Sequence, residues 1–136
     1  MRIEELAVGQ TAEFQKTVME DDITAFARVS GDYNPVHLDE EAARKTMFGG
    51  RIAHGMLGAS VISAAIAMKL PGAGSIYLSQ SLRFTKPVRI GDTVTARVEV
   101  LEVIAPKKRV RLGTTCRNQN GELVIDGEAT VMIPDG

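Results

Sequence analysis

Apolar residues change their spacing twice along the chain, and each change marks a different kind of element. Residues 11–19 alternate loosely and predict a first strand, and apolar positions in residues 23–30 then recur at helical spacing. From residue 75 onward the period falls to two and continues to residue 133, which is typical of strands joined by short turns. The pattern therefore predicts one strand, a helical section and an antiparallel meander.

The longest apolar stretch is Gly55–Met68, which carries no charge before Lys69. It is shorter than the roughly 20 apolar residues that a membrane-spanning helix needs. Because the stretch is apolar on nearly every side and rich in small residues, we expect a central buried helix with a sheet wrapped closely around it. The expected fold class is α+β, as a single domain over residues 1–136.

The meander is expected to contain one bulge and one tight hairpin. Even positions from 94 to 100 are apolar, and Leu101 then takes the opposite parity, which predicts a β-bulge where the sheet curves. Residues 118–121 predict the hairpin turn. Residues 76–84 alternate, with Gln80 as the one interruption of the apolar face, and predict a strand.

Capping residues indicate where the helices of the first half begin and end. Asp21 or Asp22 can accept from the free N–H groups of the first helix, and Gly31 is expected to end it. Asp39 is expected to cap a short helix that runs through Lys45. The residues between these two helices are expected to form an irregular loop.

That loop places an acid and an imidazole close together in sequence. Pro35 lacks a backbone donor and pushes the residue before it toward extended geometry, so Asp32 and His37 should be held in a fixed, non-helical arrangement. Asp and His side chains within reach of one water molecule can take a proton from it and return one elsewhere. The structural alternative is that Asp32 caps a turn and His37 is a buried, hydrogen-bonded residue.

The start of the apolar helix supplies a second candidate group. N–H groups near Gly55 lie at the positive end of the helix dipole, where they could hold a thioester oxygen that acquires negative charge. The alternative is that Gly55 only lets the chain turn into the helix. His54 is interpreted as a structural residue that packs before the helix.

Composition excludes several classes of function. A net charge of -1, the absence of Trp and the presence of only two Tyr and four Phe argue against nucleic acid as a partner. The lone Cys116 excludes a disulfide within the chain, and no metal-ligand spacing, phosphate loop or nucleophile elbow is found. Residues 1–10 lack an apolar run, so we expect no signal peptide, no membrane partner and a cytoplasmic location.

The catalytic candidates lie within a longer similarity. Residues 26–37, FARVSGDYNPVH, with Ala43 further on, resemble the hydratase 2 motif of the MaoC-like dehydratases. The resemblance continues through RIAHGML at residues 51–57 and LPGAGSIYL at residues 70–78, with no departure at the motif positions. It covers most of the chain and points to the short, single-domain (R)-specific enoyl-CoA hydratases.

This resemblance implies a hot-dog fold, a curved antiparallel sheet around a long helix, usually as a homodimer with acyl pockets near the subunit interface. It implies reversible syn addition of water to a trans-2-enoyl-CoA, giving an (R)-3-hydroxyacyl-CoA, without a metal or organic cofactor. By position, Asp32 and His37 would activate the water and handle the proton. Asn34 would support the loop and touch substrate, the Gly55 N–H would bind the thioester oxygen, and Ser63 would hydrogen-bond near the catalytic Asp.

Three other functions stay open at the level of sequence. A dehydratase of acyl-carrier-protein thioesters, or of branched or dicarboxylic acyl-CoAs, fits the motif as well, because the loop meets the reacting atoms and not the tail or carrier. A hot-dog thioesterase is disfavoured because Gly55–Met68 lacks a carboxylate. A non-catalytic acyl-binding subunit is disfavoured by the complete pair of Asp32 and His37.

Overall fold

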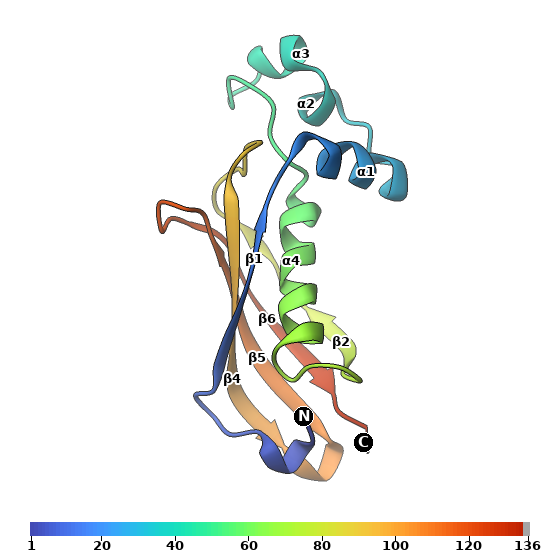
Figure 1. The fold of residues 1–136 in the computed structure, drawn as a ribbon, viewed down its shortest axis with the longest axis vertical. Coiled ribbons are helices and arrows are strands. Elements are labelled where there is room, and N and C mark those ends of the chain that lie inside the picture. The colour runs from blue at the N-terminus through green and yellow to red at the C-terminus, as the bar shows by residue number, and fades with distance from the viewer. Residues whose placement is uncertain (135–136) are drawn as a thin grey trace.

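A computed structural model describes residues 1–134, in which a curved antiparallel sheet lies against one long helix, α4 (Gly55–Met68), as Figure 1 shows. The strands are β1 (Thr11–Thr17), β2 (Ile76–Gln80), β3 (Arg83–Phe84), β4 (Thr93–Ile104), β5 (Arg109–Arg117) and β6 (Leu123–Met132). Their order across the sheet is β1-β4-β5-β6-β2, and β3 also pairs with β6. The predicted α+β architecture of a sheet and a long helix is confirmed. No helix within residues 1–134 is long and apolar enough to cross a membrane.

The core lies between α4 and the inward face of the sheet. The apolar residues at even positions from 94 to 100 are fully buried, and the register of β4 shifts between Val100 and Glu102, so the predicted bulge is confirmed. Burial raises the pKa of Cys116 to about 12, so its thiol stays protonated and serves as a core side chain.

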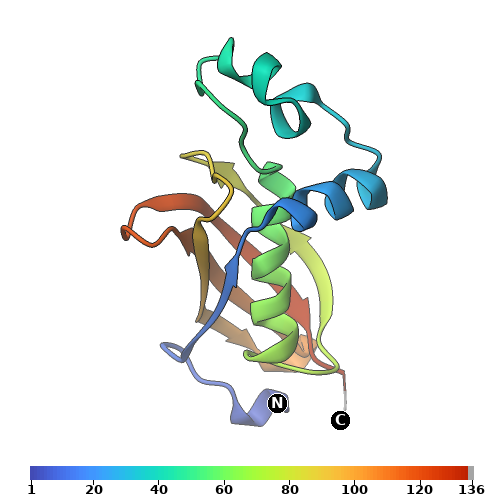
Figure 2. The same cartoon turned by 45° about the horizontal axis from the view of Figure 1, so that its top comes forward.

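Helix α4 is not surrounded on every side, which corrects the sequence-based prediction. Met56 and Met68 are 56% and 69% exposed, because the sheet of one chain covers only one face of the helix. Figure 2 shows the helix lying on the concave side of the sheet with its other side uncovered. The apolar sequence of α4 therefore predicted that the helix is more buried than it is within one chain.

The strand expected over residues 76–84 is divided into β2 and β3. The register of β2 shifts between Tyr77 and Ser79, and pairing stops before Arg83. Beyond the shift, the Ser81 backbone N–H donates to the Glu128 carbonyl at 2.8 Å. The alternation of residue types does not reveal this break, because it depends on how closely the chain approaches β6.

The approach of residue 81 to β6 requires glycine at residue 127. A Cβ added to Gly127 would lie 1.9 Å from the Ser81 carbonyl oxygen, which is backbone and cannot rotate away. We expect Gly127→Ala to lower the free energy of unfolding by about 3 kcal/mol, because the strands must separate. Urea unfolding followed by circular dichroism measures this change.

Gly113→Ala is the matched control, since Gly113 also lies in the sheet. Its Cβ would meet the Leu101 side chain at 3.5 Å, an ordinary contact. The control should change the free energy of unfolding by less than about 1 kcal/mol. Equal stability losses in the two variants would show that the contact at Ser81 is not the cause.

Three further helices gather beyond the N-terminal end of α4 (Figures 1 and 2). They are α1 (Glu20–Ser30), α2 (Pro35–Leu38) and α3 (Glu40–Arg44). Helix α1 ends at Gly31, with φ +82°, and the Asp39 carboxylate accepts from the first N–H groups of α3, both as predicted.

The predicted cap of α1 is wrong in one detail. The helix begins at Glu20, one residue before the expected capping residues, and Asp22 reaches back to accept from the Met19 N–H at 2.8 Å. This hydrogen bond is the main reason that the pKa of Asp22 is lowered. The carboxylate thus stabilises the helix start from within the first turn.

Candidate active site

Asp32 follows directly on the end of α1 and is held by hydrogen bonds to its own loop. The Asp32 N–H donates to the Ser30 hydroxyl at 3.1 Å, and its Oδ1 accepts from the Asn34 N–H at 3.1 Å. The Asp32 residue is exposed. The turn-capping role that the sequence left open is therefore present, and carboxylate lone pairs remain for a ligand.

His37 lies in helix α2 and not in irregular chain, which corrects the sequence-based prediction. Pro35 is the first residue of this helix, where a missing N–H costs nothing, and the Asn34 side chain accepts from the Val36 N–H at 3.3 Å. Proline therefore starts a helix here instead of preventing one. Asn34 supports the loop from both its backbone and its side chain, as expected.

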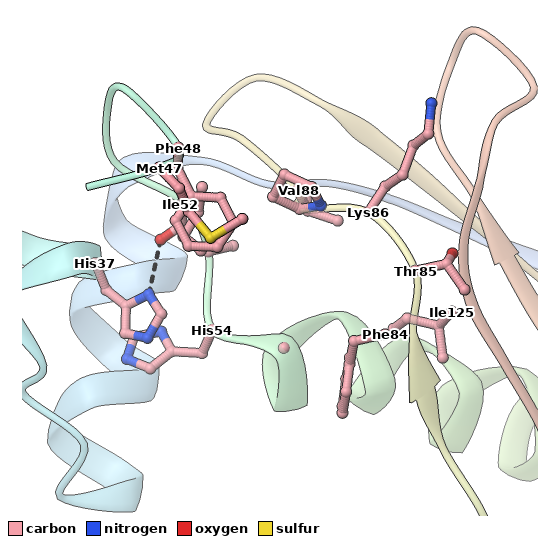
Figure 3. Close-up of a pocket in the computed structure, with 13 residues that line it drawn as sticks. His37, Met47, Phe48, Ile52, His54, Phe84, Thr85, Lys86, Val88 and Ile125 are labelled. Atoms are coloured by element: carbon pink, nitrogen blue, oxygen red, sulfur yellow. Dashed lines mark hydrogen bonds between the residues drawn. The ribbon is translucent and has the colours of Figure 1, made fainter. Parts of the chain in front are cut away.

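The hydrogen bonds of His37 define which ring nitrogen is available. Its Nδ1 lies 2.8 Å from the Ile52 carbonyl oxygen, shown by the dashed line in Figure 3. A carbonyl only accepts, so in the neutral ring the hydrogen is on Nδ1 and the lone pair is on Nε2. The Arg51 Nε also donates to the His37 carbonyl at 2.7 Å. His37 is 8% exposed, so its ring is held in one orientation with a basic nitrogen to offer.

His54 lies against this ring, a contact that the sequence did not reveal. The His37 and His54 rings stack (Figure 3), with centroids 3.9 Å apart. Phe26 packs on the other ring, His54, at a centroid distance of 4.8 Å. The His54 Nε2 lies 2.9 Å from the Asp32 carbonyl oxygen. The interpretation of His54 as only a packing residue was incomplete, because its neighbours are distant in sequence.

The fold gathers three ionisable side chains into one cluster. One side-chain ligand atom from each of Asp32, His37 and His54 lies within 4.8 Å of the others. Asp32 and His37 are thus close enough to act on one small molecule between them. Asp and His are also residue types that bind divalent metal ions, and the spacing in sequence did not indicate that they would cluster here.

Gly55 opens α4 at the edge of a cavity of about 420 Å³ that His37 also lines. The other lining residues are Met47, Phe48, Ile52, Ala53, His54, Phe84, Thr85, Lys86, Pro87, Val88 and Ile125. As the first residue of the helix, Gly55 has an N–H without an acceptor inside the helix. A Cβ here would lie 2.9 Å from the Phe84 ring, so glycine permits the close approach. The structure thus brings His37 and Gly55 to one cavity, and Asp32 is not part of its lining.

Ser63 lies elsewhere. It is exposed on α4 and lines a second cavity of about 480 Å³, between this helix and β2. That cavity is also lined by Phe26, Met56, Ala59, Ser60, Tyr77, Leu78, Ser79, Gln80 and Leu82. The structure thus places Ser63 away from the cavity that His37 and Gly55 share, and its hydrogen bond near Asp32 stays a prediction.

Known proteins are similar to this chain in sequence. The family described as MaoC like domain matches residues 4–120. The chain belongs to the MaoC-like family. An "(R)-specific enoyl-CoA hydratase" from Rhodospirillum rubrum is 53% identical over 131 residues, which are 96% of this chain and 90% of that protein. A "3-hydroxybutyryl-CoA dehydratase" from Methylorubrum extorquens is 48% identical, over 96% of this chain and 83% of that protein.

A solved structure extends the comparison to the fold. The unliganded R-hydratase PhaJ1 from Pseudomonas aeruginosa superposes with a TM-score of 0.93 at 54% sequence identity. The match covers 99% of this chain and 86% of that protein. The expected hot-dog fold of this MaoC-like chain is therefore confirmed.

Proposed function

We propose that this protein is an (R)-specific enoyl-CoA hydratase that adds water reversibly to trans-2-enoyl-CoA thioesters. The observation that carries the proposal is the clustering of Asp32 with His37, whose ring shares a cavity with Gly55 at the N-terminus of α4. The lining of that cavity is mainly apolar, which suits an acyl thioester. Relatives bearing hydratase and dehydratase names, at 53% and 48% identity, support the same chemistry.

Water is a poor nucleophile, so the first requirement is a base. The His37 Nε2 lone pair and the Asp32 carboxylate bind one water molecule between them, and the pair removes a proton as the oxygen bonds to C3. The pair then returns a proton to C2, so its own protonation is restored. Both transfers come from one side of the substrate, which gives syn addition.

The second requirement is a donor for the enolate that forms between these two proton transfers. Negative charge accumulates on the thioester oxygen when C3 is attacked. The Gly55 N–H, at the positive end of the α4 dipole, is positioned to donate to that oxygen. Neither this step nor the proton transfers require a metal or an organic cofactor.

Loss of the enoyl absorbance tests the proposal directly. Crotonyl-CoA and longer enoyl-CoAs are the substrates, and chiral analysis of the product should give the (R)-3-hydroxyacyl-CoA. Enoyl thioesters on acyl carrier protein, tested in parallel, distinguish the carrier. Failure to hydrate any of these compounds would overturn the proposal.

The cluster that could bind metal makes a chelator part of this assay. Protein treated with EDTA should keep its full rate, because the two proton transfers use Asp32 and His37 alone. Activity that disappears with EDTA and returns with Zn²⁺ would contradict the metal-free mechanism.

We also propose that the active form is a homodimer built on α4 and β2. Strand β2 is an edge of the sheet, and Ile76, Tyr77 and Leu78 are 40–43% exposed. Met56 and Met68 extend this apolar surface onto α4. An exposed sheet edge beside an apolar helix face is suited to pairing with a second copy, in a two-fold arrangement.

A charge on this surface should separate the subunits. Wild type is expected to sediment at twice 14.6 kDa, and Ile76→Lys to weaken dimerisation at least tenfold, because two lysines would be buried across the two-fold axis. Val8→Lys is the control, since Val8 is 69% exposed and lies outside α4 and β2. Sedimentation equilibrium measures both. A monomeric wild type, or dimers of equal strength in both variants, would contradict the proposed interface.

A further inference from the structure

The mechanism proposed above leaves the second histidine of the chain without a role. His54 is 2% exposed and contacts both members of the acid–base pair: it hydrogen-bonds to the Asp32 carbonyl and stacks on the His37 ring. It is also joined by a peptide bond to Gly55, whose N–H is the proposed thioester donor. One residue therefore contacts Asp32 and His37 through its side chain and adjoins Gly55 through its backbone.

The nitrogens of His54 show that it does not itself transfer a proton. The Asp32 carbonyl only accepts, so the hydrogen of the neutral His54 ring is on Nε2, which is occupied by that bond. The Nδ1 atom is buried and has no hydrogen-bond partner among residues 1–134. Neither nitrogen is thus available to a substrate proton.

We propose that His54 is a positioning residue that fixes the distance between the acid–base pair and the helix that binds the thioester oxygen. Its Nε2–H holds the Asp32 loop by the backbone, and its ring face orients the His37 imidazole. Phe26 packs on His54 and keeps the ring in place, at a centroid distance of 4.8 Å. The inference rests on the proposed hydratase function and adds a residue to it.

The two contacts of His54 can be removed one at a time. His54→Phe keeps an aromatic ring beside His37 and removes the donor to Asp32, whereas His54→Gln keeps an N–H donor and removes the ring. Each should lower kcat for crotonyl-CoA by about tenfold, and His54→Ala by about 100-fold, with KM changed less than about threefold, because misplaced groups slow the chemical step.

Val61→Ala is the control for a loss of stability alone. Val61 is 4% exposed on the same helix and lines neither cavity. Its truncation should destabilise the core. The kcat per folded molecule should equal that of wild type. If His54→Phe and His54→Gln both retain the kcat of this control, the positioning role is overturned.

Nitrogen NMR of labelled histidine gives a readout that does not need activity. The chain has two histidines, so a His54 variant shows the His37 ring alone. His37 should have its hydrogen on Nδ1 in wild type and in His54→Phe. In His54→Ala the ring loses the stacked face that holds it toward the Ile52 carbonyl, so it should average between tautomers. An unchanged, single tautomer in His54→Ala would overturn the orienting role. If wild type hydrated no enoyl-CoA, the proposed function would fail. The NMR measurement would still show whether His54 orients the His37 ring.

Discussion

Asp32→Asn lowers kcat for crotonyl-CoA hydration by about 10³-fold, because an amide cannot accept the proton that water must lose. The variant keeps the local structure, since an amide oxygen still accepts from the Asn34 N–H. His37→Gln should cost a similar factor. The double variant should be scarcely slower than either single one, because the two residues act as a unit on one water molecule.

Asp39→Asn is the matched control for this experiment. Asp39 is another carboxylate of the same helical section, where its Oδ1 caps α3. Asn caps helices as well as Asp does, so kcat should stay within about twofold of wild type. Steady-state kinetics at saturating substrate measures all the variants. Retention of more than a tenth of the wild-type kcat by Asp32→Asn would exclude its carboxylate as the essential base.

Gly55→Pro lowers kcat by about 10²- to 10³-fold by removing the N–H proposed to bind the thioester oxygen. The backbone can accept the substitution, because proline is favoured at the first position of a helix. His54, the residue before it, has φ -58° and ψ 135°, the extended conformation that proline demands of its predecessor. The loss should appear in kcat, since charge on the oxygen develops only in the transition state.

Gly55→Ala separates this effect from crowding. The alanine Cβ meets the Phe84 ring, as the proline ring would. Unlike proline, alanine retains the backbone N–H. We expect a loss of about tenfold, which leaves about 10- to 10²-fold attributable to the missing donor. Urea unfolding of both variants establishes that they are folded. Equal kcat values for the alanine and proline variants would show that the Gly55 N–H is not the donor.

Elements set by local spacing could be predicted from the sequence. The limits of α4, the bulge after Val100 and the end of α1 at Gly31 follow from periodicity and from conformations that glycine alone adopts readily. The pairing of Asp32 with His37 was also accessible, because the two residues lie in one short segment. The free N–H groups at the start of the apolar helix indicated Gly55 as the other half of the site, and the family resemblance matched it to a donor to the thioester oxygen.

Contacts between distant segments were decided only by the tertiary structure. The break between β2 and β3 depends on how closely residue 81 approaches Gly127, and the uncovered face of α4 depends on how far one sheet extends. The placement of His54 against both Asp32 and His37 has the same origin, since 22 and 17 residues separate them along the chain. Sequence alone determined which side chains can do chemistry. Packing determined which of them meet, because the distance between two helices is set by all the side chains between them.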